Sequence, residues 1–298
     1  MSIVLPNWNG VHLLEKNLPS VIVAAPKAEI IIADDASDDG SVAFIKNKFP
    51  QITLIQNSFR QGFAGNVNSG VAKATGDIVV LLNTDVRPEI GFLDPLVAHF
   101  SDPNVFAVGC MDKSIEGKKI VFRGRGVARW ERGLFIHSRG DVGKHTTAWV
   151  NGGSGAFRKD IWLKLGGMDT LFKPFYWEDI DLSYRALKSG YRLVFEPKSV
   201  VVHDHASGSI QQHYSLFTIN TLAYRNQCMF IWKNLSERSL IIDHIIWTPI
   251  RIIQAIFRFD VAFIWGYLKA LFFLPRIFSS RIRVSSFWRI SDNNVPLQ

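Results

Sequence analysis

Short apolar runs alternate with amphipathic stretches over the first hundred residues. Four runs are predicted to be strands, at 2–5, 29–33, 52–55 and 78–82. The stretches between them are predicted to be helices, at 11–24, 37–48 and 62–74. Because strands that alternate with helices form mostly parallel sheets with helices on both faces, the pattern predicts an α/β fold with a doubly wound, mostly parallel sheet.

The pattern changes beyond residue 100. From 105 to 157 it is irregular and rich in glycine, as expected of strands and loops beside a site. Two helices and two strands are predicted next, at 159–165, 177–188, 191–195 and 200–202. From about Ser209 to Ile277 the chain is predicted to be helical, with interruptions at Pro249 and Pro275. We therefore expect two domains, 1–210 and 211–298, of which the second is helical.

Polar residues follow each of the first four predicted strands. Asn7 follows the first, Asp34 and Asp35 the second, Asn57 the third, and Asn83 to Asp85 the fourth. In doubly wound sheets, ligands bind beyond the carboxyl ends of the strands. Four strand ends that offer polar groups to one crevice predict a nucleotide-like ligand.

Asp85 is a candidate metal ligand because it follows a fully apolar strand. Mg²⁺ usually takes one or two protein carboxylates and completes its shell with phosphate and water. A carboxylate at this place could therefore bind a cation shared with a diphosphate. The structural alternative is a polar turn that ends the strand and continues into Arg87 and Pro88.

The acidic run from Asp34 to Ser41 could read a nucleobase or cap the following helix. Capping accounts for Ser37 and Asp38, whereas Asp34 comes too early to cap that helix. A carboxylate at this strand end could accept the imide N–H of uracil or thymine. The run lacks the twelfth-position glutamate of an EF-hand, which argues against a calcium loop.

A second acidic group, Glu178 to Asp181, opens a predicted helix after three aromatic residues, 175–177. Helix dipoles stabilise acids in a first turn, which is the structural explanation. Aromatic neighbours exclude water, however, and a carboxylate in that setting can act as a general base. His203 and His205 follow a predicted strand and could complete a metal shell or contact a phosphate.

The net charge of +8 is concentrated near the end of the chain. Residues 225–298 hold ten Lys or Arg against four acids, mixed with Ile, Phe and Trp. Basic and bulky apolar residues together favour a membrane surface over nucleic acid. The apolar stretch 261–275 is too short to span a bilayer, which takes about 20 residues. We expect helices lying in the plane of the membrane interface; the alternative is an ordinary helical lid.

Other features of composition and sequence motifs argue against several classes of protein. The two cysteines lie far apart, which argues against a disulfide framework or zinc site and fits a reducing compartment. The first five residues lack a basic stretch before an apolar one, so we expect a cytoplasmic protein. There is no GxGxxG, HExxH or GxSxG run, and His145 follows Gly143-Lys144 where a phosphate loop needs Ser or Thr.

Taken in order, these pieces resemble the family 2 glycosyltransferases with the A-type nucleotide-sugar-binding fold, in particular the rhamnosyltransferase-like branch of bacterial polysaccharide assembly. The resemblance covers roughly residues 1–235. Seven segments carry it: 3–10, 34–41, 57–70, 76–85, 166–169, 177–182, and His203 with Gly208 and Ser209.

The resemblance implies a role for each matching residue. Asp34 would recognise a pyrimidine base, with Pro6 and Asn7 lining the nucleoside pocket. Asp85 would bind Mg²⁺ or Mn²⁺ through the donor diphosphate, with help from His203. Asn57 and Asn83 belong to the same nucleotide-sugar site, and Asn83 replaces the first aspartate of the family's DxD-like element. Asp179 would be the catalytic base, with Trp177 and Glu178 on the acceptor side.

The implied reaction inverts configuration at the sugar's anomeric carbon. The donor would be a UDP- or dTDP-sugar, and the acceptor a hydroxyl of a glycan or polyprenyl-linked glycan. The protein would work in cell-surface polysaccharide assembly, peripherally on the inner face of the cell membrane, without binding nucleic acid. Two other functions stay open at this point: a nucleotidyltransferase, although residues 6–26 lack its glycine- and lysine-rich signature, and a non-catalytic binding protein, although Asp34, Asp85 and Asp179 are present.

Overall fold

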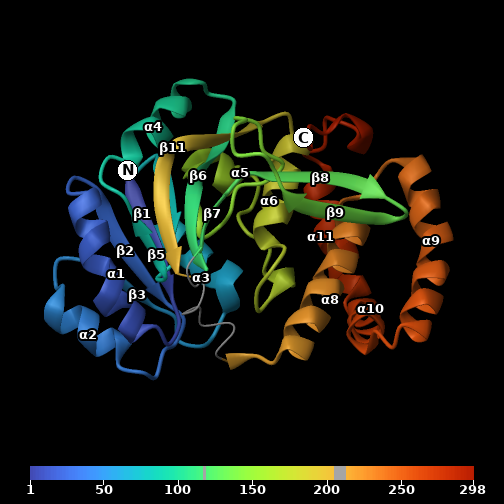
Figure 1. Cartoon of the computed structure of the whole chain (residues 1–298), viewed down its shortest axis with the longest axis horizontal. Coiled ribbons are helices and arrows are strands. Elements are labelled where there is room, and N and C mark those ends of the chain that lie inside the picture. Colours follow the sequence, from blue (N-terminus) through green and yellow to red (C-terminus); the bar gives the residue numbers. More distant parts are fainter. Residues whose placement is uncertain (117–118, 205–212) are drawn as a thin grey trace.

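A computed structural model describes residues 1–116, 119–204 and 213–298 of the chain. Within these ranges, nine strands form one curled sheet in the order β3-β2-β1-β4-β10-β6-β11-β5, with β7 paired to β6 (Figure 1). A separate hairpin consists of β8 (Gly126–Glu131) and β9 (Leu134–Arg139). The predicted α/β class is confirmed.

The first half of the sheet is parallel, and its elements follow the prediction closely. The strands are β1 (Ser2–Asn7), β2 (Glu29–Asp34), β3 (Thr53–Gln56) and β4 (Ile78–Leu82). The helices between them are α1 (Val11–Ala24), α2 (Ser41–Lys48) and α3 (Gly62–Lys73). All six residues of β1 are buried, because β2 and β4 flank it and helices cover the sheet.

The second half of the sheet is mixed. β10 (Ser154–Arg158) runs antiparallel between β4 and β6 (Val105–Glu116). β11 (Arg192–Asp204) is parallel to β6 and antiparallel to β5 (Val86–Pro88). The two short strands predicted near residue 200 are therefore one strand with a register shift between Glu196 and Val200. The remaining strand is β7 (Lys119–Arg123).

Shorter helices connect the strands of the second half of the sheet. They are α4 (Leu93–Ala98), η1 (His99–Ser101), α5 (Lys159–Lys164), η2 (Thr170–Phe172) and α6 (Glu178–Lys188). One predicted start is wrong: α2 begins at Ser41, not Ser37. The Ser37 hydroxyl donates to Asp34, and Gly40 with φ of 90° turns the chain into the helix instead.

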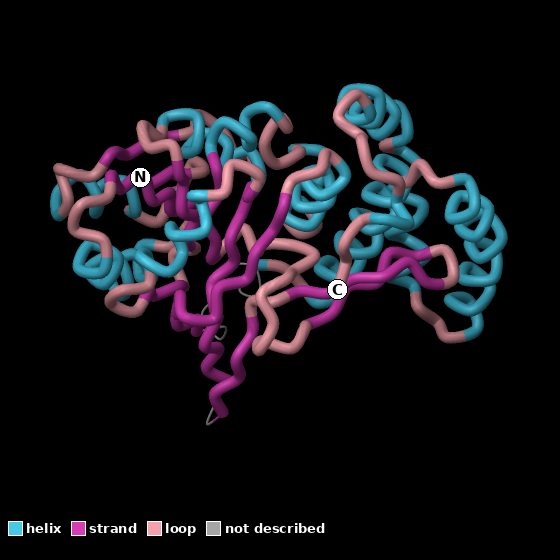
Figure 2. The backbone as a smooth tube through the Cα atoms, turned by 90° about the horizontal axis from the view of Figure 1, so that it is seen from above, coloured by secondary structure: helices cyan, strands magenta, loops and turns pink. Residues whose placement is uncertain are grey.

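Four longer helices follow, with a short turn, η4 (Asp292–Asn294), near the end. They are α8 (Leu216–Asn234), α9 (Arg238–Phe257), α10 (Val261–Phe272) and α11 (Leu274–Ser285). They gather beside the β8–β9 hairpin, away from the first strands (Figure 2). Pro249 lies inside α9 without ending it, and Pro275 lies in the first turn of α11, where a missing N–H is tolerated.

The helical region shares a core with the sheet. Met229 and Phe230 of α8 belong to the same buried cluster as Phe135 of β9 and Tyr184 of α6. The chain end returns to the hairpin, where the Ala128 amide donates to the Leu297 carbonyl at 2.7 Å. The division at residue 210 stays a prediction.

Candidate active site

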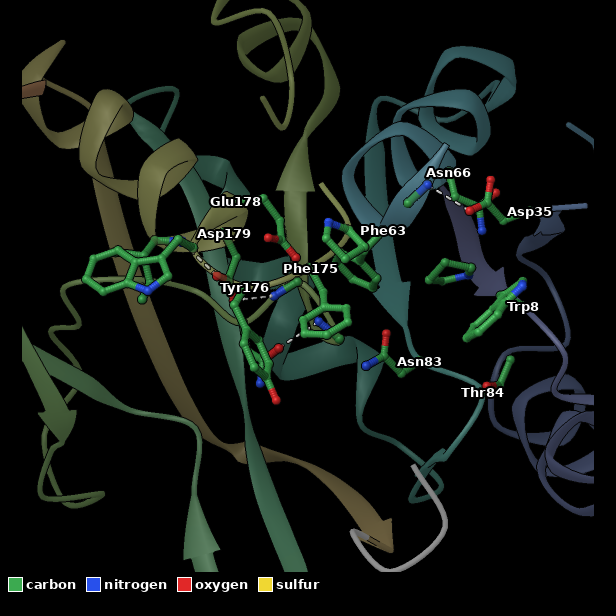
Figure 3. Close-up of a pocket in the computed structure, with 18 of the residues that line it drawn as sticks. Trp8, Asp35, Phe63, Asn66, Asn83, Thr84, Phe175, Tyr176, Glu178 and Asp179 are labelled. Atoms are coloured by element: carbon green, nitrogen blue, oxygen red, sulfur yellow. Dashed lines mark hydrogen bonds between the residues drawn. The ribbon is translucent and has the colours of Figure 1, made fainter. Parts of the chain in front are cut away.

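A cavity of about 640 Å³ opens beyond the carboxyl ends of β1 and β4, with the start of α6 on its other side. Figure 3 shows Glu178 and Asp179 across it from Trp8 and Asp35. Eight predicted site residues line it: Pro6, Asn7, Asn83, Asp85, Trp177, Glu178, Asp179 and His203. Segments from both ends of the first 204 residues thus meet at one place.

Asp34 and Asn57 do not line the cavity. Asp34 is 1% exposed, and its carboxylate is occupied by local donors. Its Oδ1 accepts from Asn7 Nδ2 at 2.8 Å and from the Ser37 hydroxyl at 2.6 Å, and its Oδ2 accepts from the Ser37 amide at 2.9 Å. This carboxylate therefore fixes the loop that follows β2.

The next residue, Asp35, does line the cavity. It accepts from the backbone amides of Gln61 and Gly62 at 2.7 and 2.8 Å, and from Asn57 Nδ2 at 3.2 Å. These contacts attach the end of β2 to the start of α3. Asn57 is therefore a support for Asp35 and not itself part of the cavity wall.

Asp85 and His203 face each other in the cavity wall. His203 Nε2 lies 3.3 Å from Asp85 Oδ2, and His203 Nδ1 lies 3.0 Å from Asp112 Oδ2. Burial disfavours the imidazolium, but the bonds to Asp112 and Asp85 outweigh it and raise the pKa of His203 to about 9. Asp85 Oδ1 is buried without a hydrogen-bond partner, so one carboxylate oxygen is left for a ligand.

Among the described residues, no group of three or more His, Cys, Asp or Glu side chains is arranged to hold a metal ion. Asp85 and His203 can therefore supply two protein ligands only, and His203 would have to release the proton on Nε2 to bind a cation. That donor set fits Mg²⁺ or Mn²⁺ where the rest of the shell comes from phosphate and water. His205 lies outside the described residues, as do Gly208 and Ser209.

Glu178 and Asp179 enter the cavity from the first turn of α6. Asp179 Oδ1 accepts from the Ile180 amide at 2.8 Å, and Oδ2 accepts from the Gly152 amide at 3.3 Å. Burial raises the pKa of Asp179, and these two bonds partly offset the rise. Burial, followed by the charge on Asp179, raises the pKa of Glu178 to about 8. Asp179 is thus the member of the pair that ionises first.

Aromatic side chains form much of the remaining wall, and Trp8, His137 and Trp149 among them were not predicted as site residues. Trp8 carries the Arg60 guanidinium 3.3 Å from its ring centroid. On the α6 side, His137 lies 5.3 Å from Trp149 and 5.0 Å from Trp177, measured between ring centroids. His137 and Trp149 come from the irregular region between 105 and 157, which shows no periodic signal that could have singled them out.

Comparison with known proteins identifies the family of this chain and relatives that match most of it. The family model for glycosyl transferase family 2 matches residues 2–165. A pre-mycofactocin glycosyltransferase of Mycobacterium tuberculosis is 29% identical over 220 residues, covering 69% of this chain and 43% of that protein. An N-acetylglucosaminyl-diphospho-decaprenol L-rhamnosyltransferase of the same species is 25% identical over 226 residues, covering 66% of this chain and 73% of that protein. This chain thus spans less than half the length of the first relative.

A solved structure shares the fold. The crystal structure of GalNAc-T7 with UDP, GalNAc and Mn²⁺ matches with a TM-score of 0.62 and 20% identity, covering 78% of this chain and 47% of that one. The predicted A-type glycosyltransferase fold is confirmed, and a nucleotidyltransferase is no longer an alternative. Since the family match extends over more than half of the chain, this protein belongs to glycosyltransferase family 2.

Proposed function

We propose that this protein transfers a sugar from a UDP- or dTDP-sugar to a hydroxyl group of a lipid-linked glycan, with inversion at the anomeric carbon. One observation carries the proposal: a single cavity holds a buried carboxylate suited to a base, Asp179, and a carboxylate with an unpaired oxygen, Asp85. The names of the relatives support it, because one acts on a decaprenol-linked sugar and the GalNAc-T7 structure holds UDP.

The donor nucleotide would bind beyond β1, β2 and β4. Asp35 lines the cavity and Asp34 does not, so we transfer the proposed nucleobase-reading role to Asp35. Pro6, Asn7 and Trp8 provide the neighbouring wall, and Arg60 is a cation close to where an anionic donor would lie. Asn83 lies beside the backbone of Gly153, to whose carbonyl the backbone N–H of Asn83 donates at 2.9 Å.

Asp85 and His203 would hold Mg²⁺ or Mn²⁺ together with the donor diphosphate. When bound, such a cation neutralises charge that develops on the leaving diphosphate. The unpaired, buried Asp85 Oδ1 fits this role, and the Mn²⁺ in the GalNAc-T7 structure supports a divalent cation in this fold.

Asp179 would take the proton from the acceptor hydroxyl. As that proton leaves, the hydroxyl oxygen forms a bond to the anomeric carbon, and the bond from this carbon to the diphosphate oxygen breaks. The nucleoside diphosphate departs with the electron pair from the opposite face, so configuration inverts. Trp177 and the protonated Glu178 would border the acceptor, in a wall that aromatic side chains keep dry.

The outer face of α9 would lie on the inner surface of the cell membrane. Among the described helices, α9 alone is long and apolar enough by itself to cross a bilayer, and α10 with α11 would pass only as one span bent by 68°. α9 is fastened along one side, because Asp243 Oδ2 accepts from the Gly133 amide at 2.6 Å and His244 bonds Trp232 Nε1 at 2.8 Å. A helix attached on one side suits insertion in the plane of the interface better than crossing.

Calorimetric titration of UDP and dTDP, with and without Mn²⁺, tests the donor site. Wild type should bind one of them in a metal-dependent manner, and Asp85→Asn should lose that dependence. Asp94→Asn is the control, because Asp94 is an exposed helix-start acid outside the cavity. Absence of binding of either nucleotide to folded wild type in the presence of lipid would reject the proposal.

A further inference from the structure

The segment Phe172–Trp177 leads into the helix that carries Glu178 and Asp179, and its backbone ends in an unfavourable conformation. Tyr176 and Trp177 have φ of 73° and 79°, a region that residues other than glycine rarely adopt. The Trp177 side chain makes no capping bond to α6. Such residues are strained and persist only where the surroundings impose them. Contacts from outside the segment must therefore hold it.

Helix α8 supplies those contacts through Asn226, which is completely buried. Its Nδ2 atom lies 3.1 Å from the carbonyl oxygen of Phe172, 3.0 Å from that of Phe175 and 2.8 Å from that of Tyr176. The two N–H groups of one amide are thus shared among three carbonyls. They tie both ends of the segment to α8.

Arg225 orients that amide and adds a fourth carbonyl. Its Nε donates to Asn226 Oδ1 at 2.9 Å, which turns the amide nitrogen towards the segment, and its Nη2 donates to the Lys173 carbonyl at 2.6 Å. Burial lowers the pKa of Arg225 to about 10, so it is charged at neutral pH. Charge-assisted hydrogen bonds are about twice as strong as neutral ones.

The other side of the segment meets the nucleotide half of the cavity. The Phe63 amide donates to the Pro174 carbonyl at 2.9 Å, and Lys173 Nζ donates to the Arg60 carbonyl at 2.5 Å. The segment therefore lies between the start of α3 and the helical region. Without α8 the segment would keep its contacts with α3 and the loop before it, and would lose those with Asn226 and Arg225.

We propose that Asn226, oriented by Arg225, is a positioning residue for the transfer reaction. It holds Phe172–Trp177 in the conformation that directs Glu178 and Asp179 into the cavity. Without its amide, three carbonyls lose their donor, and buried polar groups left unpaired are destabilising. The contacts that oppose the strain at Tyr176 and Trp177 would then be lost, so the segment would relax. The role rests on the proposed function, in which Asp179 is the base.

Steady-state kinetics test the positioning role. The assay follows release of UDP or dTDP from UDP-N-acetylgalactosamine and dTDP-rhamnose, with Mn²⁺ and a decaprenyl-diphosphate-linked N-acetylglucosamine acceptor. Asn226→Leu removes the donors at similar volume, and Arg225→Lys is a milder change expected to fold. Gln227→Ala is the control, because this neighbour donates at 3.0 Å to Phe135 of β9 instead.

Both test variants should lower kcat by about ten- to a hundredfold, the effect of a small misplacement of a reacting group. The donor KM should stay within about twofold of wild type, because the nucleotide wall is untouched. Gln227→Ala should keep near wild-type kcat. The proposal is wrong if kcat is unchanged in a folded test variant, or if the control loses as much.

Hydrogen–deuterium exchange gives a second readout that needs no activity. Amides of residues 172–181 should exchange faster in both test variants, with little change in β1–β4 and none of this effect in Gln227→Ala. If wild type shows no transfer, the proposed function fails. Hydrogen–deuterium exchange would still test whether Asn226 holds the segment Phe172–Trp177. Unchanged exchange in this segment would overturn the positioning role even in an active enzyme. If Asn226→Leu does not fold, Arg225→Lys decides.

Discussion

The strand half of the molecule and its C-terminal helices distribute polarity in opposite ways. In β1 and β4 the strand bodies are buried and apolar, and polar side chains appear where the strands end, at the cavity. In α8 the buried face is rich in polar groups: Arg225, Asn226, Lys233 and Asn234. The outer face of α9 is instead exposed and rich in isoleucine.

Exposed apolar side chains are concentrated in the C-terminal helices. Of the 26 exposed large hydrophobic side chains in the described ranges, 15 lie between Ile242 and Ile282. Both acids in Arg238–Ser285, Asp243 and Asp260, accept from backbone amides, and the exposed charged side chains there are arginines. An exposed apolar face rimmed by basic residues is complementary to an anionic lipid surface. We propose that the first region binds the nucleotide and the second contacts the membrane.

The largest expected effect is on the chemistry at the border of the two regions. Asp179→Asn should lower kcat by between about a hundred- and ten-thousandfold, the usual contribution of a general base. Nucleotide binding by calorimetry should stay close to wild type. Asp160→Asn is a matched control, because Asp160 also bonds the next amide at a helix start, that of Ile161, but outside the cavity. Equal kcat for Asp179→Asn and wild type would remove Asp179 as the base.

The buried charges that join the two regions should dominate stability. Lys233 Nζ lies 2.7 Å from Asp169 Oδ2 and 2.8 Å from Asp181 Oδ2, and it is completely buried. Lys233→Met should lower the free energy of unfolding by about 3–5 kcal/mol, because it leaves buried carboxylates short of a partner. Urea unfolding checks this against Lys46→Met, an exposed lysine on α2. A loss below about 1 kcal/mol would show that the two regions do not depend on this contact.

Stability should also depend on pH through Glu178. Its pKa rises from 4.5 to about 8 on folding, so the folded state holds a proton that the unfolded state releases above 4.5. This contribution is complete below pH 4.5 and is lost as pH rises towards about 8, by up to about 1.4 kcal/mol per pH unit. Relative to Glu178→Gln, wild type should therefore lose free energy of unfolding between these values. If the free energy of unfolding, measured with urea at each pH, changed equally with pH in the two proteins, the raised pKa of Glu178 would be contradicted.

The smallest effect should appear in membrane binding. Replacing Ile246 and Ile253 on the outer face of α9 with glutamate should weaken binding to phosphatidylglycerol vesicles by about tenfold, or 1.4 kcal/mol. Nucleotide binding should be unaffected. Ile90→Glu is the control, since Ile90 is 84% exposed but lies outside the helical region. If all three proteins sedimented equally with vesicles, the proposal that the outer face of α9 binds a membrane would be wrong.

Local patterns determined much of the fold. The predicted limits of α1 and β4 coincide with those in the structure, because apolar periodicity is written within a few successive residues. The polar strand ends also predicted a shared crevice, and eight of the ten proposed site residues line one cavity. Chain direction explains Asn7, Asn83 and Asp85, since parallel strands bring their carboxyl ends to the same edge. Trp177, Glu178, Asp179 and His203 lie outside these strand ends, and the family resemblance supplied their roles.

Tertiary contacts decided what periodicity could not. Asp34 and Asp35 are neighbouring aspartates, but Asn7 and Ser37 hold the carboxylate of Asp34, whereas Asp35 bonds the amides of Gln61 and Gly62 and lines the cavity. The amide of Asn226 reaches carbonyls some fifty residues earlier in the chain. Local sequence determines which face of a helix or strand a side chain lies on. Which of several similar polar side chains lines the cavity depends on the hydrogen-bond donors that the folded chain brings close to each of them.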